Sequence, residues 1–317
     1  MHSDLRMSLV CLLLIVGAAC SDGGESEVRT QEPEAEAALP AGTTETTTDG
    51  IIVSGFSAPE SVLHDAQLDV YLVSNINGGG LDVDDNGFIS RLAPDGTISD
   101  LRWIDGAADD VTLHAPKGMG LNGDTLIVTD IDVVRLFDRE SGEPIGEWPV
   151  DGSSFLNDVA VAADGSVFVS DMGVRFSESG LEDTGSAAIH VFGPDGAHST
   201  LDAGDVTRIN GLAARDGRVY GVTYGTGVIF SVIGGTRADL PELPGMNLDG
   251  VVALDGGELL VSDWDTQTVY LLRPNGSASA VAKNVESPAD IGIDRGRNRL
   301  LIPGLSTNQV LLAPLPG

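Results

Sequence analysis

Residues 248–263 read "LDGVVALDGGELLVSD", two short apolar runs separated by an Asp-Gly-Gly turn. Apolar runs of this length, bounded by glycine and aspartate, are typical of β-strands, and the turn between them predicts an antiparallel hairpin. Asp249 stands at the head of the first run, although aspartate is a poor strand former. Its position therefore indicates a use other than strand formation.

The same arrangement recurs along the chain. The second run has counterparts at 69–75 ("DVYLVSN"), 125–130 ("TLIVTD"), 166–171 ("SVFVSD"), 218–224 ("RVYGVTY") and 299–304 ("RLLIPG"). The heads of the first run are Glu60, Lys117, Asn157, Asn210, Asp249 and Ala289. No stretch after Gly50 shows sustained helical periodicity. Repeats of roughly 40–50 residues with four short strands each are typical of propeller blades, so the sequence predicts an all-β, six-bladed β-propeller.

The last blade predicts how the ring closes. It supplies strands at 290–294, 299–303 and 308–314 but no fourth strand. The segment "GIIVSGF" (50–56) precedes the first blade, which does not need it. We expect this segment to complete the last blade as its outer strand, which would also protect open sheet edges.

The N-terminal region has a different composition. Arg6 precedes an apolar stretch that is too short to span a bilayer, and Gly-Ala-Ala precedes Cys20 as in a bacterial lipobox. We expect residues 1–20 to be a lipoprotein signal peptide with lipidation at Cys20, a plain secretion signal being the alternative. Residues 21–49 are acidic and almost free of bulky apolar side chains, which predicts a disordered tether before a domain at 50–317.

The net charge and the cysteine content limit the partners and the cross-links that this protein can have. Aspartate and glutamate number 48 against 17 lysines and arginines, giving a net charge of -31 that disfavours nucleic acid as a partner. Both cysteines lie within the first twenty residues, so the mature domain has no disulfide. We expect an exported monomer, held in the cell envelope (in the periplasm or on the outer surface) or else secreted, which contacts a membrane only through a lipid anchor.

The strand heads predict a metal site. The innermost strands of a propeller line its central channel, so equivalent positions of different blades meet around the axis. Glu60, Asn157, Asn210 and Asp249 would bring four oxygens and two formal negative charges together. Such a set suits Ca²⁺ first, with Mg²⁺, Mn²⁺ or Zn²⁺ as other candidates. The alternative is a set of polar side chains that line a water-filled channel.

The motifs "PES" (59–61), "LND" (156–158), "ING" (209–211) and "LDG" (248–250) carry a family resemblance. Over residues 50–315 the chain resembles the six-bladed propellers of the senescence marker protein, regucalcin and gluconolactonase family, and more distantly diisopropyl fluorophosphatase. The resemblance implies that Glu60, Asn157, Asn210 and Asp249 coordinate a divalent metal, and that Asp249 also acts as the catalytic base.

Two positions depart from that family. Sugar-lactone members carry a substrate-binding arginine two residues before the first ring asparagine, where this chain has Phe155, which argues against sugar-lactone specificity. Lys117 is also unexpected. It would either reach over the metal to an anionic substrate or, as we favour, pair with Asp158 or Asp290.

These features predict a metal-dependent lactonase or related esterase with a small-molecule substrate. A non-catalytic binding propeller, using the insertions at 75–86 and 172–187, is the alternative. His114 is the one histidine expected near the channel mouth, which gives a histidine relay little support, and no G-x-S-x-G nucleophile motif is present. Residues 82–87 ("DVDDNG") resemble the start of an EF-hand loop, but Ala93 stands where its last ligand belongs. We therefore read that segment as an Asp-rich turn, with a weak second Ca²⁺ site as the alternative.

Overall fold

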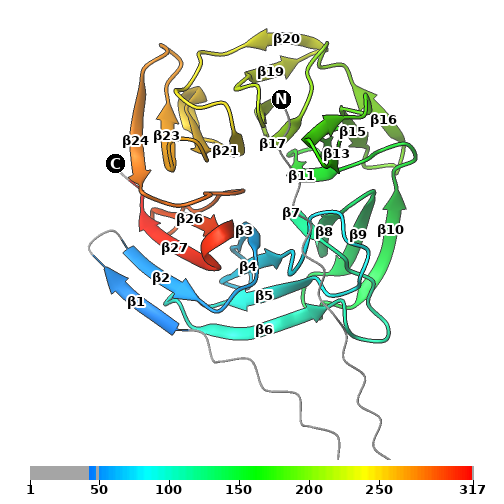
Figure 1. The fold of residues 1–317 in the computed structure, drawn as a ribbon, viewed down its shortest axis with the longest axis vertical. Helices are drawn as coiled ribbons and strands as arrows, with labels where there is room; N and C mark the ends of the chain where they lie inside the picture. The colour runs from blue at the N-terminus through cyan, green and yellow to red at the C-terminus, as the bar shows by residue number, and fades with distance from the viewer. Residues whose placement is uncertain (1–42, 48–49, 316–317) are drawn as a thin grey trace, which may run out of the picture. The chain divides into compact units, whose positions relative to one another are not determined.

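The computed structural model describes residues 43–47 and 50–315. These residues form six antiparallel sheets arranged as blades around a central axis (Figure 1), with two single-turn 3₁₀ helices, η1 (Asp255–Gly257) and η2 (Leu305–Thr307). The prediction of an all-β, six-bladed propeller is confirmed. Among the described residues, no helix is long and apolar enough to cross a membrane.

Blades 1 to 3 follow in chain order, each with its first strand innermost. Blade 1 contains β3 (Pro59–Asp65), β4 (Val70–Asn75), β5 (Phe88–Leu92) and β6 (Ile98–Asp105). Blade 2 contains β7 (Pro116–Asn122), β8 (Thr125–Asp130), β9 (Val133–Asp138) and β10 (Pro144–Pro149). Blade 3 contains β11 (Leu156–Val161), β12 (Val167–Asp171), β15 (Ala188–Phe192) and β16 (His198–Leu201). Its insertion forms a separate hairpin of β13 (Val174–Ser177) and β14 (Gly180–Asp183).

Blades 4 to 6 complete the ring. Blade 4 contains β17 (Ile209–Arg215), β18 (Arg218–Thr223), β19 (Ile229–Ile233) and β20 (Thr236–Asp239). Blade 5 contains β21 (Leu248–Ala253), β22 (Leu259–Asp263), β23 (Thr268–Leu272) and β24 (Ala278–Lys283). Blade 6 contains β25 (Gly292–Asp294), β26 (Arg299–Gly304), β27 (Gln309–Pro314), β2 (Gly50–Ser54) and β1 (Thr43–Thr47).

Blade 6 closes the ring with a strand from the start of the domain, as expected. β2 pairs with β27 in antiparallel register, Val53 lying opposite Val310. One detail differs from the sequence analysis, which assigned Thr43–Thr47 to the tether: these residues form β1, which pairs with the outer edge of β2. Threonine has a high strand propensity, and an edge strand needs backbone partners more than a buried face. The signal peptide with Cys20 and residues 21–42 of the tether lie outside the described residues and stay predictions.

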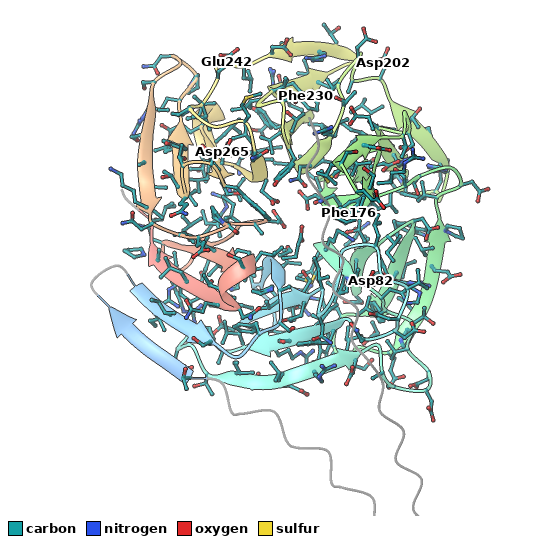
Figure 2. All side chains as sticks on the ribbon, in the orientation of Figure 1. Asp82, Phe176, Asp202, Phe230, Glu242 and Asp265 are labelled. Carbon is teal, nitrogen blue, oxygen red and sulfur yellow. The ribbon has the colours of Figure 1, made fainter. Side chains whose placement is uncertain are left out.

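The hydrophobic core is divided among the interfaces between neighbouring blades. Six clusters of buried side chains each join one blade to the next around the axis. Across the closure, Val53, Val310 and Leu312 of blade 6 pack against Val62 and Tyr71 of blade 1. Figure 2 shows Phe230 inside the packed body of blade 4, whereas Asp202 and Glu242 lie at the periphery. Because every blade contributes to two interfaces, the innermost strands are held rigidly around the axis.

Candidate active site

The innermost strands of blades 1 to 5 each carry a β-bulge at the strand head. In β21, Leu248 pairs with Asp263 and Val251 with Val261, so Asp249 and Gly250 together face the single residue Ser262. A bulge of this kind redirects the side chain that it contains. The bulge heads are Glu60, Lys117, Asn157, Asn210 and Asp249. A residue with low strand propensity is tolerated at the bulge because the backbone hydrogen-bond ladder between the two strands is already interrupted there.

Hydroxyl groups of the second strands fix these bulges and link them to the next blade. Ser262 Oγ accepts the Gly250 N–H (2.7 Å) and donates to the carbonyl of Ala289 in blade 6 (2.8 Å). Ser170 Oγ accepts the Asp158 N–H (2.9 Å) and donates to the carbonyl of Asn210 in blade 4 (2.6 Å). The serine of the repeated "VSD" sequence thus positions one strand head and connects it to its neighbour.

Glycine permits the close approach of neighbouring heads at Gly211. A Cβ atom there would lie 2.2 Å from the carbonyl oxygen of Asp249. Such a separation is far inside van der Waals contact with a backbone atom. The spacing between Asn210 and Asp249 therefore depends on the absence of a side chain at Gly211, the residue that follows Asn210.

Gly211→Ala should displace Asp249 and destabilise the domain. We expect the free energy of unfolding in urea to fall by about 2 kcal/mol, as for other overpacked sites. Gly146→Ala on β10 is the matched control, because a Cβ there meets only Leu136 Cδ1 at an ordinary 3.7 Å. If Gly211→Ala and Gly146→Ala had equal free energies of unfolding, the strand heads Asn210 and Asp249 would be able to move apart without loss of stability.

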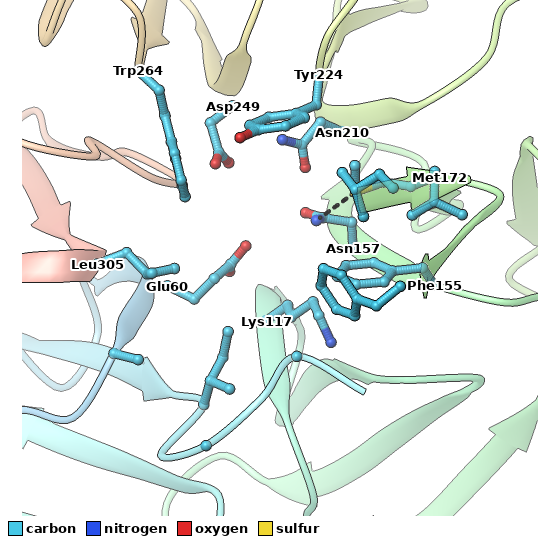
Figure 3. Close-up of a pocket in the computed structure, with 17 residues that line it drawn as sticks. Glu60, Lys117, Phe155, Asn157, Met172, Asn210, Tyr224, Asp249, Trp264 and Leu305 are labelled. Atoms are coloured by element: carbon cyan, nitrogen blue, oxygen red, sulfur yellow. Dashed lines mark hydrogen bonds between the residues drawn. The ribbon is translucent and has the colours of Figure 1, made fainter. Parts of the chain in front are cut away.

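Four of the bulge heads present oxygen atoms to a single cavity, as Figure 3 shows. Their side chains are almost fully buried, yet four of their oxygens make no hydrogen bond: Glu60 Oε2, Asn157 Oδ1, Asn210 Oδ1 and Asp249 Oδ1. We call these four residues the oxygen ring. The two amide nitrogens are engaged elsewhere, Asn157 Nδ2 with Met172 Sδ (3.3 Å) and Asn210 Nδ2 with the Leu248 carbonyl (3.2 Å). Both amides therefore turn their oxygens toward the cavity.

The oxygen ring fits a hard divalent cation. Leaving a buried acceptor without a partner costs roughly 1–3 kcal/mol, and four such acceptors facing one cavity would be satisfied together by one ion. Within the described part of the chain, no three His, Cys, Asp or Glu side chains are placed to hold a metal. The oxygen ring differs from such a cluster in using two carboxylates and two amides, a donor set suited to Ca²⁺. All four ligands predicted from the sequence line this cavity.

Four carboxyl groups around the axis have perturbed ionisation. Burial, reinforced by the charge of Asp290, raises the pKa of Asp249 to about 8. Burial also raises the pKa of Glu60 well above its usual value, with Asp249 and Asp290 adding to the effect. The pKa of Asp290 rises to about 7 and that of Asp158 also rises, in both cases through burial first. The negative charge gathered here is electrostatically unfavourable unless a cation accompanies it.

Lys117 does not make the ion pair expected from the sequence. Its ammonium donates to the carbonyl of Ala115 (3.0 Å) and lies 4.5 Å from the centroid of the Phe155 ring. Asp158 instead accepts the N–H groups of Val159 and Leu212 (both 2.6 Å). The prediction that Lys117 pairs with Asp158 or Asp290 is therefore wrong, because the adjacent backbone and the Phe155 ring take up the ammonium. Burial lowers the pKa of Lys117 to about 8.

Three other sequence-predicted residues lie outside the lining of the cavity. Asp158 and Asp290 are buried behind it, where Asp290 Oδ2 accepts a hydrogen bond from Ser61 Oγ (2.5 Å). His114 contacts the Asp-rich turn, where its Nδ1 accepts the Asp85 N–H (3.1 Å). Asp84 in the same turn bonds with Asn86 Nδ2 (2.6 Å). The segment 82–87 is therefore a turn held together by its own hydrogen bonds.

The sequence analysis missed a second layer above the oxygen ring. The residue directly after the second strand lines the cavity in five of the six blades. We call these residues the collar: Ile76, Met172, Tyr224, Trp264 and Leu305. Their side chains share no chemical class apart from bulk, so only their equivalent positions in the repeats could have identified them. Oxygen ring, collar and the β13–β14 hairpin together border a cavity of about 250 Å³.

Comparisons with solved structures support the architecture. A gluconolactonase from Xanthomonas campestris superimposes with a TM-score of 0.65 at 19% identity, covering 89% of this chain and 94% of that protein. A putative gluconolactonase gives a TM-score of 0.61 at 18% identity, with 88% and 95% coverage. A chain of a nidogen–laminin complex gives 0.55 at 15% identity, with 73% and 91% coverage. No family model and no curated protein matches the sequence. The chain thus has a gluconolactonase-like propeller fold, as the sequence resemblance implied.

Proposed function

We propose that this protein is a divalent-metal-dependent hydrolase of a lactone or a related ester. The observation that carries the proposal is the set of four buried, unpartnered oxygens of the oxygen ring in one cavity. Gluconolactonases are among the proteins with this fold, which supports lactone hydrolysis as the reaction class. Ca²⁺ is the proposed ion, with Mg²⁺, Mn²⁺ or Zn²⁺ as alternatives.

In the proposed reaction, Glu60, Asn157, Asn210 and Asp249 would hold the ion, which would supply Lewis-acid polarisation of the substrate carbonyl and lower the pKa of water. Asp249 accepts a proton from the attacking water as its oxygen bonds to the carbonyl carbon. The ring C–O bond of the lactone then breaks, and the proton passes from Asp249 to the departing alkoxide oxygen. The products are an alcohol and a carboxylic acid on one open-chain hydroxy acid, and the acid then ionises by releasing its proton to solvent.

In this proposal, the Lys117 ammonium assists the reaction electrostatically. Among the described residues that line the cavity, Lys117 is the only one with a cationic group, and its ammonium partly offsets the charge on Glu60, where it lowers the pKa. A fixed positive charge beside the reacting carbonyl favours the negative charge that develops on its oxygen. The contact with Phe155 holds the ammonium at the cavity wall.

A non-catalytic binding propeller is the second candidate. Val83 and Phe176 project from the two insertions with 72% and 57% of their surfaces exposed. Exposed apolar side chains on long loops are typical of contact surfaces for other molecules. Strong stabilisation by a metal, without turnover of any ester or lactone, favours this candidate.

Thermal unfolding with Ca²⁺ or EDTA tests the metal centre. Saturation to about 100 times Kd adds about 2.7 kcal/mol, so we expect the Tm to rise by about 5 °C or more over the EDTA sample. Glu60→Gln should abolish this rise. The metal-free variant should be at least as stable as the metal-free native protein, because a buried, repelled carboxylate has been made neutral.

Asp84→Asn in the Asp-rich turn is the matched control, since Asp84 is exposed and lies outside the cavity lining. It should keep the full Ca²⁺ response. Loss of the response in Asp84→Asn together with its retention in Glu60→Gln would place the ion in the turn and contradict the proposed metal centre.

A further inference from the structure

The cavity has two chemically distinct zones. Of the seventeen described residues that line it, only Glu60, Lys117, Asn157, Asn210 and Asp249 carry a charged or amide group, and all five are bulge heads. The collar above them offers the Tyr224 hydroxyl and the Trp264 indole N–H as its polar hydrogen-bonding groups. Every other lining side chain is apolar or absent.

The apolar zone is built up most strongly on blade 3. Phe155, Met172 and Val174 form a buried cluster against which Leu181 and Tyr224 pack. Phe176 of the β13–β14 hairpin meets Phe155 edge to face, with ring centroids 6.1 Å apart. Figure 2 shows Phe176 on the side of its blade that faces the central axis. Leu305 faces this cluster from blade 6 (Figure 3).

We propose that the substrate is a neutral, hydrophobic lactone or ester whose apolar body occupies the collar while its carbonyl lies at the oxygen ring. This inference rests on the proposed hydrolytic function and narrows its substrate class. A polyhydroxylated lactone would bury several hydroxyl groups against side chains that cannot form hydrogen bonds with them. The net charge of -31 also repels anionic substrates, whereas a neutral molecule enters without that barrier.

The cavity also limits the size of the substrate. Its volume of about 250 Å³ lies below the roughly 300–1,000 Å³ of pockets that hold drug-sized ligands. A single lactone ring with a short alkyl or aryl substituent suits this space. The exposed Phe176 at the rim gives a longer chain a further apolar contact outside the cavity.

A series of δ-lactones with alkyl substituents of increasing length tests the inference. We expect kcat/KM to rise about threefold for each added methylene until the cavity is filled, since each buried methylene adds transfer free energy. Glucono-δ-lactone should react at least about 100-fold more slowly than the best alkyl lactone. A preference for glucono-δ-lactone, or no dependence on chain length, overturns the inference while leaving lactone hydrolysis intact.

Leu305→Asn should flatten the dependence of kcat/KM on alkyl chain length. Leu305 is only partly buried and lies in η2, so the fold should tolerate the change. Ile233→Asn is the control, because Ile233 is 46% exposed at the end of β19, remote from the cavity lining. An equal effect of both substitutions contradicts a role for the collar.

Binding without turnover separates this inference from the hydrolase proposal. Alkyl-substituted cyclopentanones lack the scissile C–O bond and probe the collar alone. We expect them to change the Trp264 fluorescence, with an affinity that increases with chain length, and Trp264→Phe should remove the signal. If these ketones bind in that order and no lactone is hydrolysed, the apolar site stands and the hydrolase proposal falls. If they do not bind while alkyl lactones are hydrolysed, the collar assignment is overturned.

Discussion

Replacing Asp249 by asparagine should lower kcat for the best ester or lactone substrate by at least about 100-fold, since general bases typically contribute 10²- to 10⁴-fold. The asparagine keeps a side-chain oxygen near its place in the oxygen ring but cannot accept the proton of the attacking water. Turnover is measured at saturating Ca²⁺, so that weaker ion binding does not mimic the loss of the base.

Two controls isolate this effect. The Ca²⁺-dependent rise in Tm of Asp249→Asn shows whether the ion still binds, and the kcat comparison is made only between ion-saturated proteins. Asp255→Asn, in η1 of the same blade and exposed, should leave kcat unchanged. Ion-saturated Asp249→Asn with more than a tenth of the native kcat would remove Asp249 from its assigned role.

Truncation of the first strands should have the largest effect on stability. A protein that begins at Gly55 lacks β2, which exposes one edge of β27 and removes the fully buried Val53 from the cluster between blades 6 and 1. Single large-to-small substitutions in a core cost about 2–5 kcal/mol, and this truncation removes a whole strand, so we expect no cooperative thermal transition above 25 °C.

A protein that begins at Gly50 is the matched control. Of the described strands it loses only β1, which pairs with β2 and donates a hydrogen bond from Thr44 Oγ1 to the Gly96 carbonyl (2.8 Å), and its Tm should fall by no more than a few degrees. A synthetic peptide of residues 50–56, added to the protein that begins at Gly55, should restore a cooperative thermal transition. Truncated proteins of equal stability would mean that β2 is not needed to close the ring.

Repetition explains why much of the fold and site was predictable. Blade number, closure by the N-terminal strand and the positions of the four oxygen-ring residues all follow from equivalent places in the repeats, as Asn210 and Asp249 illustrate. β1 was missed because its threonine-rich sequence has no hydrophobic pattern, and it is held in the sheet by backbone pairing with β2.

The contacts that individual side chains make were harder to predict from the sequence. The ion pair expected for Lys117 depended on distances that the bulge and the Phe155 ring determine, and neither is visible in a residue spacing. The collar was missed for a related reason. Met172 and Trp264 share a position after the second strand but no chemistry that a motif would reveal.

The pairing of β2 with β27 also has a kinetic consequence. Ile51 lies opposite Leu312, about 260 positions away along the chain. Because contacts between residues so far apart in sequence form slowly, we expect the pairing of β2 with β27 to be slow. On a ribosome, β2 stays without its partner β27 until nearly the whole domain has emerged. Completion of the ring is therefore a late event, which can only follow the emergence of β27.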